Sequence, residues 1–356
     1  MGNRIIGRIY LGALAALFMF PLQSARADTD EVVAMAGKLS GAAREKFLVE
    51  GAKREGNVQL VTTLRAEEVT HLLNVFSGRY PFIRGTAIRG GSDRNFARVE
   101  QESRAGKLTS DLWHINATFF SLALRNRLIA SYLSPESAAY AARFRRKEGN
   151  FVAVEISVGV LGYNRRLVPD QEAPKTYQDL LNPKWKAKIS MDESPERELI
   201  ALIIAWGKDR AFAFMKSLLR QEIQIRRGHV LRAQLLCAGE FEISFELNAH
   251  SIYPLIHKGC PIGTVPMVPI PAQPGGLAVI RGGPNPHAAI LLYDWILSKE
   301  GMTAFVSMGR VGTRADVKSP YREIDALQKS EDLALIMPER SAELESAAAF
   351  IKQYWK

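Results

Sequence analysis

The sequence predicts an α/β protein of two lobes joined by crossing strands. Strand-like and helix-like segments alternate in two successive runs, which is typical of parallel sheets with crossover helices. A long β-branched segment, FVAVEISVGVLGYN (151–164), separates the two runs. A proline-rich segment, TVPMVPIPAQPGG (264–276), leads back from the second run. Because the last helical segments have no sheet of their own, we expect the chain to return to the first lobe.

The first run alternates strands with helices. A charged opening segment, 30–54, carries apolar residues near helical spacing and is predicted to be one helix. The expected strands that follow are 57–63, 82–88 and 110–115, and the expected helices are 67–77, 93–106 and 119–127. This order predicts a sheet covered by helices on both faces.

The second run repeats the pattern. Its expected strands are 188–191, 223–226 and 242–245, and its expected helices are 196–206, 210–219, 229–238 and 249–257. Since proline lacks the amide hydrogen of a sheet ladder, we expect the segment after Gly263 to be an edge or a linker. A strand at 277–280 and four helical segments complete the chain. We therefore predict a first lobe over 28–153, a second lobe over 154–275, and a return with C-terminal helices over 276–356.

The first 27 residues predict a cleavable secretory signal peptide. Arg4 and Arg8 precede an apolar run over 9–20, and Ala25-Arg26-Ala27 forms an A-x-A cleavage motif. The run is shorter than the roughly 20 residues that span a membrane, so an uncleaved anchor is the weaker alternative. Cleavage removes three arginines and lowers the net charge from +10 to +7. We expect an exported, periplasmic protein.

Export also bears on partners and cysteines. The densest basic cluster, 143–147, is short and is interpreted as a solvated face, and export argues against nucleic acid. Cys237 and Cys260 form a disulfide, which export permits, or remain two buried thiols. The sequence leaves both cysteine states open.

The junction IRGGSDRNFARVE (88–100) is the first candidate for a binding site. An expected strand ends here in two glycines and a serine, and a helical pattern follows. Open α/β sheets bind ligands at the carboxyl edge of their strands, and the free amides of a helix start favour negative charge. Gly91 allows close backbone approach, Ser92 offers a hydroxyl, and Arg89 can pair with an oxyanion. A plain turn with a helix cap is the alternative.

Other expected strand ends also carry polar residues. Thr63 ends the first strand, Asn116 follows the third, and His229 and Asn248 each stand between a strand and a helix. Several polar groups at one sheet edge indicate a binding site better than any one of them alone.

Motifs for catalysis are absent from the sequence. It contains no G-x-S-x-G, no H-E-x-x-H, no P-loop and no paired-cysteine metal motif, so we expect neither an enzyme nor a cofactor. His250 and Tyr253 lie three residues apart and are weak candidates for metal ligation. A partly exposed amphipathic helix face explains that spacing equally well.

The segment TYQDLLNPKWKAKISMDE (176–193) resembles the periplasmic solute-binding proteins of ABC importers, in their ferric-iron-binding-like group. Five further segments agree in order: EGNVQLVTT (55–63), YPFIRGTAIRGGSDRNFARVEQESRAGKLTSDLW (80–113), GVLGYNRRLVP (159–169), RRGHVLRAQLLCAGEFEIS (226–244) and NPHAAILLYDWILSKEGM (285–302). The resemblance implies a type II periplasmic binding protein: two Rossmann-like lobes joined by crossing hinge strands, with a ligand cleft between them.

The resemblance also implies which residues bind the ligand and which membrane protein takes it up. By position, the cleft residues are Thr63, Arg89, Gly91, Ser92, Asn116, His229 and Asn248. Iron-binding members commonly use adjacent tyrosines where this sequence reads Asn248-Ala249-His250. We therefore expect a monomer that delivers a small anionic or metal-chelate ligand, with ferric iron as one candidate, to an inner-membrane ABC permease. A secreted enzyme on a two-lobed scaffold and a ligand sensor for a membrane receptor are the alternatives.

Overall fold

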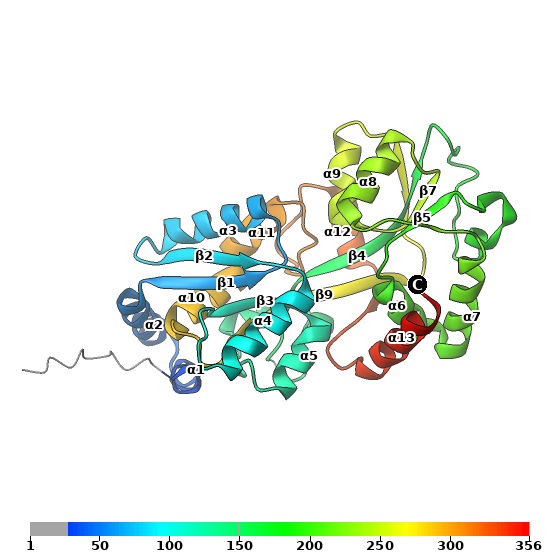
Figure 1. The fold of residues 1–356 in the computed structure, drawn as a ribbon. Coiled ribbons are helices and arrows are strands. Elements are labelled where there is room, and N and C mark those ends of the chain that lie inside the picture. Colours follow the sequence, from blue (N-terminus) through cyan, green and yellow to red (C-terminus); the bar gives the residue numbers. More distant parts are fainter. Residues whose placement is uncertain (1–27, 149, 356) are drawn as a thin grey trace, which may run out of the picture.

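The computed structural model describes residues 28–148 and 150–355, which form two α/β lobes connected by crossing strands (Figure 1). The strands follow the order β2-β1-β3-β9-β4-β7-β5-β6 from one lobe to the other, with β10 beside β9 and β8 beside β4. The predicted two-lobed fold is confirmed. The expected signal peptide, 1–27, lies outside the described residues. Within the described part of the chain, no helix is long and apolar enough to cross a membrane.

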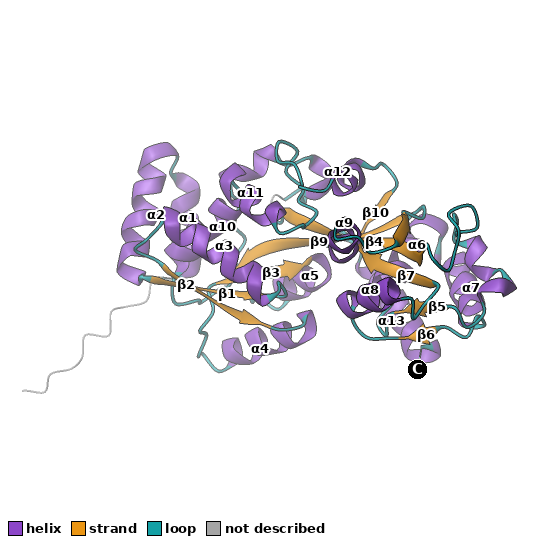
Figure 2. Ribbon diagram, turned by 90° about the horizontal axis from the view of Figure 1, so that it is seen from above, coloured by secondary structure: helices purple, strands orange, loops and turns teal. Residues whose placement is uncertain are grey.

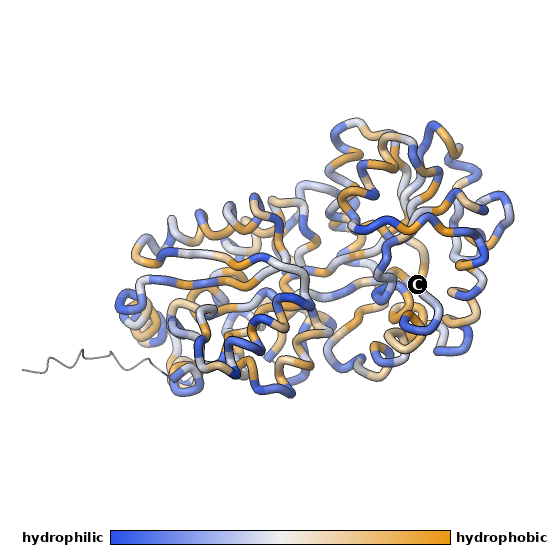
Figure 3. Tube along the Cα trace, viewed as in Figure 1, coloured by the Kyte–Doolittle hydropathy of each residue, from blue (hydrophilic) through white to orange (hydrophobic). Residues whose placement is uncertain are grey.

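Lobe 1 is built on three parallel strands. These are β1 (Asn57–Thr62), β2 (Arg84–Arg89) and β3 (Leu112–Asn116), and their carboxyl ends meet at one edge of the sheet. One face carries α2 (Gly41–Glu55), α3 (Ala66–Arg79), α10 (Pro286–Leu297) and α11 (Lys299–Ser307), and the other carries α4 (Ser92–Arg104) and α5 (Ala117–Arg125). Apolar residues of β1, β3 and these helices form the core of the lobe, and apolar and polar stretches alternate along the trace (Figure 3).

Lobe 2 repeats this plan. Its parallel strands are β5 (Ile189–Met191), β6 (Gln224–Ile225) and β7 (Ile243–Asn248). Helices α6 (Glu196–Trp206) and α7 (Lys208–Leu219) cover one face, α8 (His229–Ala238) and α9 (Ala249–His257) cover the other, and β8 (Ile262–Val265) pairs with β4. Short 3₁₀ helices lie at Pro135–Ala139, Ala142–Phe144, Gln178–Leu181 and Pro183–Trp185.

Two long strands cross between the lobes (Figure 2). The first half of β4 (Ala153–Asn164) pairs with β9 (Ile270–Val279), and its second half pairs with β7 and β8. The expectation of an edge or linker for the proline-rich segment was therefore wrong, because β9 is a central strand. Pro271 follows the last pair with β4, and Pro274 lies between the stretches paired with β10 and β3. Each proline has one unpaired side, where a missing amide hydrogen is tolerated.

The C-terminal elements divide between the lobes. The return packs α10 and α11 on lobe 1, as expected from the sequence. In contrast, β10 (Leu333–Leu335) pairs with the lobe 2 end of β9, α12 (Arg322–Lys329) packs on α9, and α13 (Ser341–Tyr354) packs on α6 and α7. The proposed lobe boundaries at residues 153 and 275 stay a prediction, but the chain enters lobe 2 a second time.

One predicted helix differs in the structure, and the state of the two cysteines is now decided. The helix expected over 30–54 is two helices, α1 (Thr29–Lys38) and α2, because the backbone is extended at Leu39. Cys237 and Cys260 form a disulfide, which ties the end of α8 to the loop between α9 and β8.

Candidate functional site

A cleft of about 470 Å³ lies between the two lobes, at the carboxyl edges of both sheets. Six of the seven residues predicted from the sequence line it: Thr63, Gly91, Ser92, Asn116, His229 and Asn248. His250, a weak metal candidate, lines it as well. Strand ends that are distant in the sequence therefore meet here, as parallel sheets require.

The other two predicted residues lie elsewhere. Arg89, the last residue of β2, lines a separate hollow with residues of α3, and its Nε donates to the Leu64 carbonyl at 2.6 Å. The pairing of Arg89 with an oxyanion at the strand end, which the sequence suggested, is therefore not available in this structure. Tyr253 is buried, and its hydroxyl lies 3.4 Å from Thr264 Oγ1. Neither side chain is part of the cleft lining.

Four helices begin at the cleft. They are α4 after Gly91, α5 after Asn116, α8 after Gly228 and α9 after Asn248. Only Asn116 caps its own helix with its side chain, and the other three starts have no side-chain cap. Free amide groups and helix dipoles at three of these starts favour a negative group in the cleft.

A buried ionic cluster forms the lobe 1 side of the cleft, and sequence reasoning missed it. We call it the Arg310 cluster: Arg310, Glu68, Glu155 and His114. Arg310 donates to both Glu68 oxygens at 3.0 and 2.6 Å and to Glu155 at 3.2 Å. His114 Nε2 lies 3.2 Å from the other Glu155 oxygen. The arginine is thus neutralised by two carboxylates.

The pKa values of the two carboxylates follow from this pairing. Burial alone would raise the pKa of Glu68, but its hydrogen bonds and ion pair with Arg310 bring it down to about 2. Burial likewise opposes ionisation of Glu155, and the Arg310 charge nevertheless holds its pKa well below the ordinary value. Both glutamates are ionised at neutral pH, so this side of the cleft carries paired charges.

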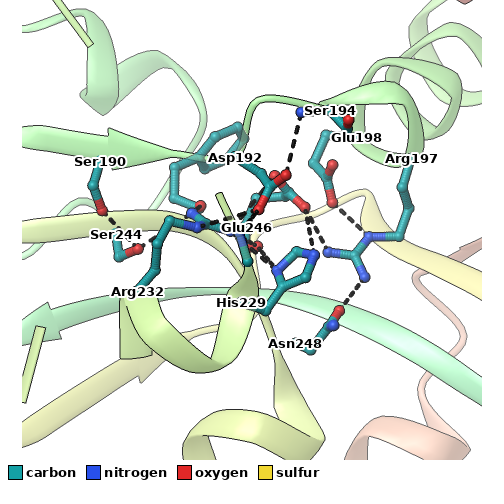
Figure 4. Close-up of polar contacts among 12 residues, drawn as sticks. Ser190, Asp192, Ser194, Arg197, Glu198, His229, Arg232, Ser244, Glu246 and Asn248 are labelled. Carbon is teal, nitrogen blue, oxygen red and sulfur yellow. Dashed lines mark hydrogen bonds and ion pairs between the residues drawn. The ribbon is translucent and has the colours of Figure 1, made fainter. Parts of the chain in front are cut away.

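A second buried cluster lies on the lobe 2 side (Figure 4). We call it the Arg197 cluster: Arg197, Glu198, Glu246 and Asn248. Arg197 donates from Nε to Glu198 at 2.6 Å, from Nη2 to Glu246 at 2.9 Å, and from Nη1 to the Asn248 side-chain oxygen. Burial raises the pKa of both glutamates. Glu246 has a positive φ of 68°, opposite an irregularity in the β4–β7 pairing, so backbone strain lies beside the cleft.

His229, at the first position of α8, is neutral. Burial, reinforced by the positive charges of Arg197 and Arg232, lowers its pKa well below the ordinary value. Arg232 Nη2 lies 3.0 Å from His229 Nδ1. The Glu246 carbonyl oxygen lies 3.1 Å from the same nitrogen, so a donor and an acceptor both face Nδ1. His229 therefore presents a neutral imidazole to the cleft.

The side chains that line the cleft can be compared with those that usually ligate metal ions. Among the described residues, no group of three or more histidine, cysteine, aspartate or glutamate side chains is placed to hold a metal ion. No tyrosine is part of the cleft lining either. The side chains of this cleft suit an oxygen-rich anion better than a bare cation.

Comparisons with known proteins agree with this geometry. Residues 111–231 match the model of a family described as bacterial extracellular solute-binding protein. An uncharacterized protein of Haemophilus influenzae is 28% identical over 235 residues, which cover 62% of this chain and 66% of that protein, just under two thirds.

Solved structures share the two-lobed fold over most of the chain. Iron-bound HitA of Pseudomonas aeruginosa superposes with a TM-score of 0.72 at 18% identity, covering 83% of this chain and 98% of HitA. The periplasmic binding protein AfuA of Actinobacillus pleuropneumoniae, with fructose 6-phosphate bound, gives 0.68 at 21% identity, covering 84% and 97%. The solved structures show that this chain has the fold of type II periplasmic binding proteins, and residues 111–231 resemble the bacterial extracellular solute-binding proteins.

Proposed function

We propose that this protein is the periplasmic substrate-binding component of an ABC uptake system and delivers a small anionic ligand to a membrane permease. The observation that carries the proposal is the cleft itself, where helices from both lobes begin and three helix starts lack a side-chain cap. A ligand held there would touch both lobes, so its binding favours the closed arrangement of the two.

The volume of the cleft and the hydrogen-bond donors that line it indicate the class of ligand. A cleft of about 470 Å³ suits a small organic molecule or a metal chelate. Ser92 Oγ accepts from Asn116 Nδ2 at 3.1 Å, which leaves the serine hydrogen free to be donated. With the free helix amides, this hydroxyl suits the cleft to an oxyanion such as a phosphate ester or a carboxylate. Ferric iron would then enter as a chelate whose carboxylates meet these donors.

Location and partner rest on the family and the N-terminal sequence. The family consists of extracellular proteins, and the motif at residues 25–27 supports cleavage of a signal peptide. We propose a monomer, because the cleft is built from the two lobes of one chain.

Calorimetric titration of the purified protein tests the proposal. The panel contains ferric citrate, ferric iron with carbonate, inorganic phosphate, fructose 6-phosphate and a polyamine as a cationic control. We expect an anionic member to bind and the polyamine not to bind. Binding of the polyamine alone would refute the anionic ligand class, and turnover of a bound compound would refute a pure binding role.

The variant Ser92→Ala tests the helix starts. Loss of a hydrogen bond to a charged ligand should weaken binding roughly tenfold to hundredfold, because such bonds contribute about 1.5–3 kcal/mol. Ser103→Ala, near the other end of α4, is the matched control and should bind as the wild type does. Equal affinities for both variants would remove the α4 start from the site.

A further inference from the structure

Two asparagines occupy equivalent places in the two lobes but are used differently. Asn116 ends β3 and precedes α5, and Asn248 ends β7 and precedes α9. The Asn116 side-chain oxygen accepts from the Phe119 amide at 3.0 Å and so caps its helix. Asn248 makes no such bond, although asparagine is among the best N-cap residues. Something must hold the Asn248 side chain away from α9.

Arg197 is the group that holds it. This side chain is only 8% exposed, and its Nη1 donates to Asn248 Oδ1. Because a guanidinium has no acceptor, the Asn248 atom that faces it must be the oxygen. The amide nitrogen therefore turns away from Arg197 (Figure 4). Glu198 and Glu246 fix the other two guanidinium nitrogens at 2.6 and 2.9 Å, so the arginine cannot readily turn aside.

The α9 start is left open as a result. Its first amide groups have no side-chain acceptor, and the Asn248 amide nitrogen has no protein partner within the described residues. His250, in the first turn, lines the cleft, is 8% exposed and has a buried Nδ1 without a hydrogen-bond partner in the described part of the chain. The α9 amides and the Asn248 amide nitrogen therefore remain available to a ligand, and the unpartnered His250 Nδ1 lies beside them.

We propose that Arg197 is a positioning residue: it withdraws Asn248 from the N-cap of α9 and keeps this helix start available for the ligand. The inference rests on the proposed function and deepens it. The part of the ligand that reaches α9 must accept hydrogen bonds from amide groups, which assigns an oxyanion oxygen to this place. Without Arg197, the Asn248 oxygen would turn onto the α9 amides and compete with the ligand.

Hydrogen exchange of the ligand-free protein tests the positioning directly. Arg197→Lys keeps the positive charge beside Glu198 and Glu246 but lacks the fork that reaches Asn248. We expect the Ser251 amide, the third residue of α9, to exchange about fivefold more slowly in this variant, because the released asparagine caps the helix. An unchanged exchange rate at Ser251 in a folded variant would overturn the proposal.

Binding provides the second readout. For any panel anion that binds the wild type, Arg197→Lys and Asn248→Ala should each weaken binding about tenfold or more. The double variant should bind no more weakly than Asn248→Ala, because Arg197 acts on the α9 start only through the Asn248 side chain. Losses that multiply in the double variant would show a merely structural arginine and overturn the proposal.

Arg44→Lys is the matched control. Arg44 is a partly buried lobe 1 arginine whose Nη2 lies 2.6 Å from Asp294, outside the cleft. Its substitution should leave affinity unchanged while lowering thermal stability. If no panel member binds the wild type, the proposed ligand class fails, yet the exchange rate at Ser251 still decides the role of Arg197.

Discussion

Buried arginines paired with glutamates lie on both sides of the cleft. Arg310 lies on the segment that follows α11, and its partners Glu68 and Glu155 come from α3 and the crossing strand β4. Such a cluster is costly to break, because removing one member leaves an unpaired buried charge. Its role here is to fix the positions of cleft residues from three distant parts of the sequence.

These residues could not be identified from the sequence. Glu155 is the only charged residue in the apolar strand β4, and Arg197 lies in the triplet Glu196-Arg197-Glu198 that begins the apolar helix α6. Both patterns indicate that a charge enters the interior, but the partner is decided by packing between distant segments. For Arg89, the sequence correctly predicted a position at the end of a strand. It could not predict the direction of the side chain, which points to the Leu64 carbonyl.

The imidazole of His250 predicts a pH dependence of stability. Burial, followed by the charge of Arg310, lowers its pKa to about 3, whereas an unfolded histidine titrates near 6.5. Between these two pH values, His250 is protonated in the unfolded state but not in the folded state. The free energy of unfolding therefore decreases as the pH falls from about 6.5 toward 3.

Urea unfolding at pH 8 and pH 5 measures the effect. Relative to His250→Gln, the wild type should lose about 2 kcal/mol of unfolding free energy between these two pH values. Parallel pH profiles for the two proteins would show that His250 is protonated in the folded state.

At the scale of elements, periodicity predicted most helices well. The bounds of α6, α8 and α9 agree with the expected helices, because glycine, proline or asparagine marks their ends. Strand β9 was missed in its first half, where the local signal of two prolines outweighed a β pattern. Tertiary pairing overrode that signal because each proline has one side without a partner.

The disulfide stabilises the elements that carry the lobe 2 helix starts. Cys237 and Cys260 are 23 residues apart and enclose β7 and α9. Closing a loop of this length should contribute about 3 kcal/mol by restricting the unfolded chain.

The double variant Cys237→Ala/Cys260→Ala tests this contribution. Its unfolding free energy in urea should be lower than that of the wild type by about that amount, and dithiothreitol should reduce the stability of the wild type only. Equal stability of the reduced and oxidised wild type would contradict the prediction.

The whole molecule is held together by β4 and β9, which belong to the sheets of both lobes. Two strands between rigid lobes form a hinge, and a ligand that contacts both lobes should favour closure. Small-angle X-ray scattering should therefore show a smaller radius of gyration when a binding anion is present. An unchanged radius of gyration at saturating ligand would mean that the protein binds the ligand without closure of the two lobes. The sequence predicted this two-lobed plan through the order of its elements, but not the distances across the cleft.

The division of the C-terminal elements has a consequence for synthesis of the protein. Lobe 1 needs α10 and α11, and lobe 2 needs β10 and α13, whose Phe350 is buried in the lobe 2 core. A ribosome that has released only the first 270 residues has therefore made neither lobe in full. Each half-built lobe exposes apolar surface that later segments will cover. Neither lobe can therefore complete its hydrophobic core before the C-terminal elements have been synthesised.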